Sequence, residues 1–211
     1  PKCMMPICGK PLLSWWMELF EKHSVTEVLV NTHYLPDAVR EFVQIYNAKN
    51  TGVRLIEAYE KELLGSGGTI LANKGFVESE SDFLVCYADN LTDTNLSELI
   101  AFHRKKQSVL TMGLFYTNKP IECGIAAIDS QDLIYEFTEK PESPKSNLAN
   151  AGIYVTGQEI FKYLPNQKFI DFGKDVLPKL INKMYGYEIK DYLLDIGNLD
   201  NYEKAQKEWQ L

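Results

Sequence analysis

The stretch Leu64-Gly65-Ser66-Gly67-Gly68-Thr69, with the apolar run 83–87 and Asp89 after it, decides how this chain is interpreted. Consecutive small residues let a backbone approach a flat or charged ligand closely. An aspartate that ends a buried strand is where an open α/β sheet holds a metal or phosphate group. A second such aspartate, Asp195, follows the apolar run 192–194. A glycine-rich turn also occurs as a mere tight connection, but together these features predict a metal-assisted nucleotide site.

The composition of the chain is that of an ordinary globular protein. Its 211 residues are 45% hydrophobic and 24% charged, which suffices for one core with a small lid. No apolar run is long enough to predict a membrane span. The formal net charge is −7 without a basic cluster, which argues against a nucleic-acid partner. An anionic small ligand would therefore be bound by a few lysines, backbone N–H groups and a divalent cation.

The cysteines and histidines do not predict a metal centre of their own. The four cysteines form no CxxC pair and the three histidines are scattered, so we expect no zinc site. Small apolar cysteines such as Cys86 and Cys123 fit the reducing environment of a cytoplasmic protein.

Strand-like and helix-like segments alternate along the first half of the chain. We expect helices over 12–22, 35–46, from about Thr69, and over 96–105, and strands over 27–31, 53–59, 83–87 and 109–116. The second half adds strands with short links over 124–128, 133–139 and 149–155, helices over 159–163 and 175–184, strands over 187–189 and 192–195, and a final helix over 201–209. The predicted class is α/β, with a Rossmann-like mixed, mostly parallel sheet flanked by helices.

Six motifs then follow one another in a familiar order. They are Pro1-Lys2 with 5–7 and 9–13 (PKxxxPIxGKPLL), Leu64-Gly65-Ser66-Gly67-Gly68 (LGTGG), Tyr87-Ala88-Asp89 (GD), 137–141 (FxEKP), 150–154 (NAGIY), and Asp195-Ile196-Gly197 with Tyr202 (DIGTPEDY). In this order they resemble the sugar nucleotidyltransferases, or nucleoside-diphosphate-sugar pyrophosphorylases. The likeness is strongest to mannose-1-phosphate and D-glycero-D-manno-heptose 1-phosphate guanylyltransferase-like enzymes. Two departures stand out. Ala88 replaces a glycine, and the family's first strand and GGxGTR loop, which would be expected before Pro1, are missing from this sequence.

The resemblance implies a reaction and a set of roles. A nucleoside triphosphate, foremost GTP, and a sugar 1-phosphate would give a nucleotide sugar and pyrophosphate, with Mg²⁺ as cofactor. The implied catalytic residues are Lys2, Asp89, Lys140 and Asp195, of which Asp89 and Asp195 would hold the metal. The implied nucleotide-binding residues are Glu60, Leu64, Gly65, Gly67 and Gly68, and the sugar-binding residues are Gly124, Glu139 and Asn150. Residues 1–211 would form a single catalytic domain with a small sugar-binding lid, incomplete at its N-terminus. The protein would be cytoplasmic and could form a homodimer.

Alternative interpretations remain at several positions. Lys2 and Lys140 could be solvated surface charges, Glu139 a strand-end carboxylate and Asn150 a turn residue. A thymidylyl-, uridylyl- or cytidylyltransferase of the same family would carry the same motifs. A metal-dependent glycosyltransferase would normally have an Asp-x-Asp pair, which the segment 89–93 does not supply. A non-catalytic paralogue that senses nucleotide sugars would be expected to lose the aspartates or Lys140.

Overall fold

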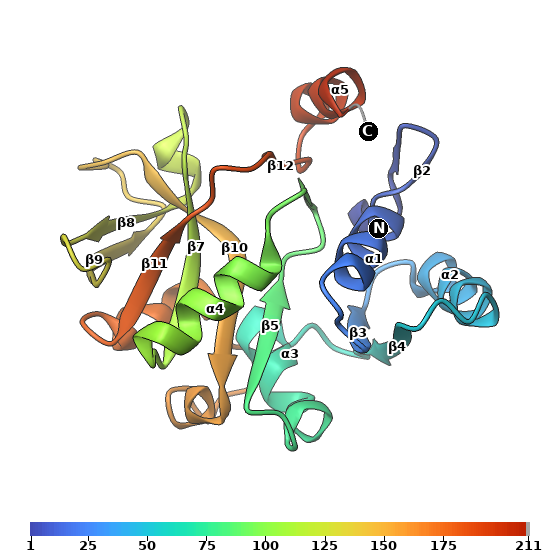
Figure 1. Ribbon diagram of the computed structural model, residues 1–211, viewed down its shortest axis with the longest axis horizontal. Coiled ribbons are helices and arrows are strands. Elements are labelled where there is room, and N and C mark those ends of the chain that lie inside the picture. The colour runs from blue at the N-terminus through green and yellow to red at the C-terminus, as the bar shows by residue number, and fades with distance from the viewer. Residues whose placement is uncertain (210–211) are drawn as a thin grey trace. The chain divides into compact units, whose positions relative to one another are not determined.

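The computed structural model describes residues 1–209, and these fall into two compact units (Figure 1). The first unit contains Pro1–Leu63, Tyr87–Asn95 and the chain from Asp191 onward. The second contains Leu64–Cys86 and Leu96–Lys190. The expectation of a single catalytic domain over 1–211 stays a prediction, and each unit is described by itself.

The first unit combines three α-helices with three short two-stranded ladders. Its helices are α1 (Leu12–Lys22), α2 (Pro36–Ala48) and α5 (Leu199–Glu208), and a 3-10 turn spans Lys2–Met4. Its strands are β1 (Pro6–Ile7), β2 (Lys10–Pro11), β3 (Glu27–Thr32), β4 (Arg54–Tyr59), β6 (Asn90–Thr92) and β12 (Leu193–Asp195). The ladder β3–β4 is parallel, whereas β1–β2 and β6–β12 are antiparallel.

Helix α1 has the bounds that its apolar stripe predicts. Leu12, Trp16 and Phe20 recur at helical spacing and are buried, while the charged residues of the helix are exposed. The Trp16 indole donates a hydrogen bond to the carbonyl oxygen of Asn90 at 2.8 Å. This bond ties α1 to the start of β6, directly after Asp89.

Helix α5 is hydrogen-bonded to the antiparallel pair β1–β2 near the start of the chain. Helix α5 begins after Asn198, whose side chain accepts from the Asn201 N–H at 2.9 Å. On the same helix, the Tyr202 hydroxyl donates to the Pro6 carbonyl at 2.8 Å, and Gln206 bonds both Pro6 and Cys8. Helix α5 and the β1–β2 pair are thus held together within this unit.

The second unit is built on a six-stranded sheet. Its strands are β5 (Asp82–Cys86), β7 (Leu110–Tyr116), β8 (Gly124–Ile128), β9 (Ile134–Glu139), β10 (Leu148–Gly157) and β11 (Met184–Glu188). Its α-helices are α3 (Gly65–Ala72) and α4 (Leu96–Lys106). Short 3-10 turns span Lys74–Val77, Pro120–Glu122, Gln158–Lys162 and Leu177–Leu180. A π-helical turn spans Phe172–Val176. The strand order is β11-β7-β10-β8-β9, and β5 also pairs with β10. Helix α4 packs on β7, β10 and β11 (Figure 1).

The mixed α/β class is confirmed, but parallel pairs are fewer than expected. Among residues 1–209, the ladders β3–β4 and β7–β11 are parallel and all others are antiparallel. The long strand β10 runs antiparallel to its neighbours β5, β7 and β8. Antiparallel neighbours can be joined by a short link, as β8 and β9 are by residues 129–133, whereas parallel neighbours need a long crossover.

Three expected helices differ from those observed. The segment expected as a helix over 159–163 is the 3-10 turn Gln158–Lys162. Helix α3 begins at Gly65, four residues before the expected start, so the glycines form its first turn. The helix expected over 175–184 is replaced by a π-helical turn and a 3-10 turn that ends at Leu180, and β11 begins at Met184. Pro178 lies inside that segment and has no N–H to donate, which interrupts α-helical hydrogen bonding.

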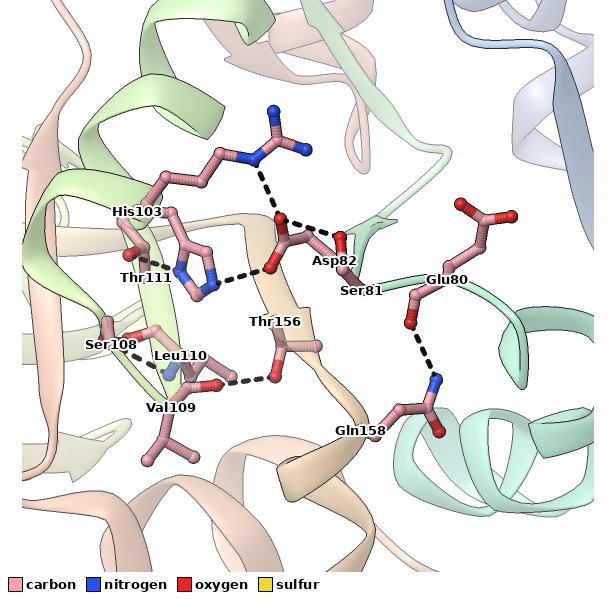
Figure 2. Close-up of polar contacts among 11 residues, drawn as sticks. Glu80, Ser81, Asp82, His103, Ser108, Val109, Leu110, Thr111, Thr156 and Gln158 are labelled. Carbon is pink, nitrogen blue, oxygen red and sulfur yellow. Dashed lines mark hydrogen bonds and ion pairs between the residues drawn. The ribbon is translucent and has the colours of Figure 1, made fainter.

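A buried polar network joins α4 to the sheet of the second unit (Figure 2). His103 Nδ1 lies 2.9 Å from the Thr111 hydroxyl, and His103 Nε2 lies 3.6 Å from Asp82 Oδ1. Arg104 donates to the other oxygen of Asp82 at 2.8 Å. Although a Thr-His-Asp order resembles a nucleophilic triad, Thr111 is completely buried, so no substrate reaches its hydroxyl. The network is therefore a structural link between α4, β5 and β7.

Candidate active site

Lys2, Asp89 and Asp195 form a cluster in the first unit, hereafter the lysine–aspartate cluster. Asp89 directly precedes β6 and Asp195 is the last residue of β12. Because β6 and β12 are antiparallel with Asn90 opposite Asp195, the two aspartates reach the same end of the ladder. The Ile196 N–H donates to the Asp89 carbonyl at 3.0 Å and holds the two segments together.

The lysine of this cluster comes from the opposite end of the sequence. Lys2 Nζ lies 3.1 Å from Asp89 Oδ2. The Gly197 N–H donates to Asp195 Oδ1 at 2.6 Å. A Cβ atom added at Gly197 would lie 2.7 Å from Asp195 Oδ1 and 3.2 Å from Lys2 Nζ, so both charged groups border this glycine. The structure therefore brings together three residues that the motifs name separately.

The donor set of this cluster suits a hard divalent cation. Two aspartates are available, and no group of three or more histidine, cysteine or acidic side chains gathers in a metal-binding arrangement within residues 1–209. Mg²⁺ is usually bound through one or two carboxylates, with phosphate oxygens and water completing its octahedron. Asp89 and Asp195 could hold such an ion.

Glu60, also in the first unit, is a buried carboxylate at the end of β4. Only 6% of its surface is exposed. Its Oε1 accepts from the Asn31 amide at 3.3 Å, and its backbone carbonyl is 2.9 Å from His33 Nδ1. These bonds fix Glu60 at the carboxyl ends of the parallel pair β3–β4, the edge at which α/β sheets bind ligands.

The glycine-rich turn in the second unit packs against another segment of backbone. The N–H groups of Gly67 and Gly68 both donate to the Ile170 carbonyl, at 2.8 and 3.3 Å, and Ile170 donates back to Leu64 at 2.8 Å. Gly65 has φ +77°, and a Cβ there would lie 2.5 Å from the Ile170 oxygen. The small residues are thus required by this close contact, and the N–H groups of Gly67 and Gly68 are bonded to a carbonyl of the protein itself.

Glu139 and Gly124 face each other across the β8–β9 ladder of the second unit. A Cβ at Gly124 would lie 2.6 Å from Glu139 Oε2, so the carboxylate occupies the space beside the glycine. Burial raises the pKa of Glu139, the nearby Asp171 raises it further, and Lys140 and Lys174 partly offset this. Glu139 is therefore a half-buried carboxylate with a raised proton affinity, rather than a solvated strand end.

Lys140 and Asn150 are held by local backbone geometry. Lys140 has φ +48°, its N–H donates to the Cys123 carbonyl at 3.0 Å, and its side chain is exposed. Asn150 lies where the β7–β10 register shifts. Its Oδ1 accepts from the Gly152 N–H at 2.9 Å and its Nδ2 donates to the Tyr154 hydroxyl at 2.7 Å. The conformations of both are thus set by the strands that carry them.

The predicted residues are divided between the two units. Lys2, Glu60, Asp89 and Asp195 lie in the first; Leu64, Gly65, Gly67, Gly68, Gly124, Glu139, Lys140 and Asn150 lie in the second. Sequence reasoning missed Asp171 and Gly173, which lie beside Glu139. No local pattern marks them, because they are far from Glu139 along the chain.

Comparison with known proteins identifies the family. The model of the Nucleotidyl transferase family matches residues 1–210. The chain belongs to this family. Mannose-1-phosphate guanylyltransferase of Mycobacterium tuberculosis is 27% identical over 209 residues, which cover 97% of this chain and 57% of that protein. UTP–glucose-1-phosphate uridylyltransferase of Synechocystis is 28% identical over 224 residues, with the same two coverages.

Two solved structures show the same fold. HddC of Yersinia pseudotuberculosis superposes with a TM-score of 0.84 at 25% identity, covering 100% of this chain and 90% of HddC. A Bacillus anthracis protein titled a putative glucose-1-phosphate thymidylyltransferase has a TM-score of 0.85 at 18% identity, a likeness of fold alone. The chain spans 57% of the length of the two curated relatives named above. Within residues 1–209, no helix combines the length and apolar character needed to cross a bilayer.

Proposed function

We propose that this nucleotidyltransferase joins a nucleoside triphosphate, foremost GTP, to a mannose- or heptose-type sugar 1-phosphate. The products are a nucleotide-diphosphate sugar and pyrophosphate. The observation that carries the proposal is the lysine–aspartate cluster, in which one cation and two carboxylates meet at the end of the β6–β12 ladder.

The chemistry asks for positioning and charge neutralisation. The phosphate of the sugar attacks the α-phosphorus of the triphosphate and pyrophosphate leaves. Since the second pKa of a phosphate is about 6, the nucleophile is already anionic at neutral pH and needs no general base. The phosphoryl centre gathers negative charge that nearby cations stabilise.

The cluster would supply that charge stabilisation. Asp89 and Asp195 would hold Mg²⁺, which when bound neutralises phosphate oxygens and fixes their orientation. Lys2 acts as a point charge on a phosphate, and its contact with Asp89 keeps its ammonium group beside the metal ligands. Lys140, exposed at the end of β9, would provide a second cation.

Recognition of the two substrates is assigned to different residues. The turn Leu64, Gly65, Gly67 and Gly68 would offer the base a flat backbone surface, and Glu60 would accept from a guanine edge. Glu139 and Asn150 would bond sugar hydroxyls, with Gly124 leaving room beside them. A site built to hydrogen-bond hydroxyls rejects epimers strongly, because unpaired polar groups remain in the wrong complex.

The choice of guanine is supported by relatives but not by all of them. HddC of Yersinia pseudotuberculosis was solved in complex with GMP-PN, at 26% identity to this chain. Other relatives are named for uridylyl and adenylyl transfer. A uridylyl-, thymidylyl-, cytidylyl- or adenylyltransferase is therefore the alternative within the same class of enzyme.

A substrate matrix tests the proposal. The full protein is mixed with each of five nucleoside triphosphates and with mannose-, heptose- and glucose-type 1-phosphates, and pyrophosphate release is followed with and without Mg²⁺. We expect the highest kcat/KM with GTP and a mannose- or heptose-type substrate. A preference for another base would keep the transferase and refute guanylyl transfer, and no release with any pair would refute the reaction.

A further inference from the structure

The carboxylate of Glu139 lies in a slot formed by two glycines, Gly124 on β8 and Gly173 in the π-helical turn. A Cβ at Gly173 would lie 2.7 Å from Glu139 Oε2 and 3.1 Å from its Cδ. A Cβ at Gly124 would lie 2.6 Å from the same oxygen. The slot is closed on both sides, so any side chain at either glycine displaces the carboxylate.

We propose that Gly173 is a positioning residue for substrate recognition: by having no side chain, it leaves Glu139 the one orientation in which its carboxylate accepts from the sugar. This inference rests on the proposed function and deepens it. Gly173 touches no substrate itself and acts only through Glu139.

The backbone at position 173 does not itself require glycine. Its φ lies outside the left-handed region, so an L-residue can adopt it. The other atom close to an added Cβ is Asp171 Oδ1, at 3.3 Å. The lack of a side chain at Gly173 is therefore explained by the two carboxylates beside it rather than by backbone conformation.

The turn that carries Gly173 is held by hydrogen bonds and burial. The Phe172 N–H donates to the Ser66 hydroxyl at 3.0 Å, and the fully buried Phe172 ring packs edge-on against Tyr154. The Lys174 N–H donates to Asp171 Oδ1 at 3.0 Å. Because this wall is fixed while Glu139 Oε2 is the far end of a flexible side chain, a methyl group at 173 moves the carboxylate rather than the wall.

Gly124 is less suitable for testing the slot. A Cβ there would also lie 2.7 Å from the buried ring of Phe137, so Gly124→Ala disturbs the core as well as Glu139. Gly173→Ala is the cleaner perturbation. Gly75→Ala is its matched control, because a Cβ at Gly75 meets nothing within 4 Å.

A double-mutant cycle with Glu139→Asp tests the positioning role. Aspartate is one methylene shorter and withdraws its carboxylate from the slot, so the methyl group at 173 no longer displaces it. We expect Gly173→Ala alone to raise KM for the sugar 1-phosphate about tenfold, the effect of one weakened charge-assisted hydrogen bond. KM for the nucleotide should stay unchanged. In the Glu139→Asp background, Gly173→Ala should change KM for the sugar less than about twofold.

The outcomes separate this inference from the proposed function. An equal rise in KM for the sugar in both backgrounds, a rise in both KM values, or unfolding in both backgrounds would overturn the positioning role. A similar effect of Gly75→Ala would also overturn it, because it would show a general response to added methyl groups. If the unsubstituted protein releases no pyrophosphate with any substrate pair, the proposed function itself has failed, whatever the variants do.

Discussion

Removal of the Asp89 carboxylate should lower turnover by at least about a hundredfold without unfolding the protein. The side chains of Asp89 and its ion-pair partner Lys2 are 32% and 56% exposed. Ion pairs this open to water contribute about 0–1 kcal/mol to folding. We therefore expect Asp89→Ala to lower the free energy of unfolding by less than about 1 kcal/mol.

The catalytic effect should be several times larger. Loss of one group that stabilises charge in a transition state raises the activation free energy by about 3 kcal/mol, which corresponds to at least a hundredfold in kcat. Asp195→Ala should have the same effect, because both carboxylates serve one end of the β6–β12 ladder. For the same reason, the double variant should be little slower than either single variant.

The assay follows pyrophosphate release at saturating substrate across a Mg²⁺ titration, with thermal melting of each variant. Glu136→Ala is the matched control, since it breaks the exposed ion pair with Lys145 on the surface of the second unit. The control should retain full activity. A near-normal Mg²⁺-dependent rate in Asp89→Ala or Asp195→Ala would refute the metal assignment. Loss of folding in Asp89→Ala would refute the expected stability change of less than about 1 kcal/mol.

Three further outcomes can be measured. Glu139→Ala should raise KM for the sugar 1-phosphate far more than KM for the nucleotide; a rise in the nucleotide KM alone would reverse the assignment. Asp171→Asn should lower the pKa of Glu139, because it removes a neighbouring negative charge that raises it. The loss of sugar affinity on acidification should then move to lower pH in a KM–pH profile, and an unmoved profile would refute this coupling. Burial lowers the pKa of His103, so the unfolded chain takes up this proton at higher pH than the folded one. Stability should therefore fall as pH drops below about 6.5, and the slope of Tm against pH should be smaller in His103→Gln; an equal slope would contradict the buried neutral histidine.

Much of the secondary structure was predictable because it depends on local periodicity. The stripe that includes Leu12 and Trp16 predicts a helix over 12–22, which are the observed bounds of α1. The segment 175–184 has helical spacing too, but Pro178 interrupts it, and the chain forms short π-helical and 3-10 turns instead. Proline costs about 3 kcal/mol in a helix interior, so one residue here outweighs the apolar spacing.

The motifs predicted the family, but they did not predict which groups surround each residue of the site. The resemblance named Glu139, and the structure adds that burial and Asp171 raise its pKa and that Gly173 borders its carboxylate. Such neighbours come from distant parts of the chain, and no spacing rule connects them. The roles of these residues in binding stay predictions until the variants are measured.

Motifs and apolar spacing within short windows were enough to predict the family, the α/β class and the positions of most helices and strands. Which side chains and backbone groups contact one another depends on the folding of distant segments onto each other. Lys2 lies beside Asp89 because two sets of contacts meet there. The β6–β12 ladder joins the segment after Asp89 to the segment before α5, and α5 is in turn hydrogen-bonded to Pro6, close to Lys2 in sequence. The N–H groups of Gly67 and Gly68 bind Ile170, since buried backbone donors must find an acceptor and the nearest one belongs to a distant segment.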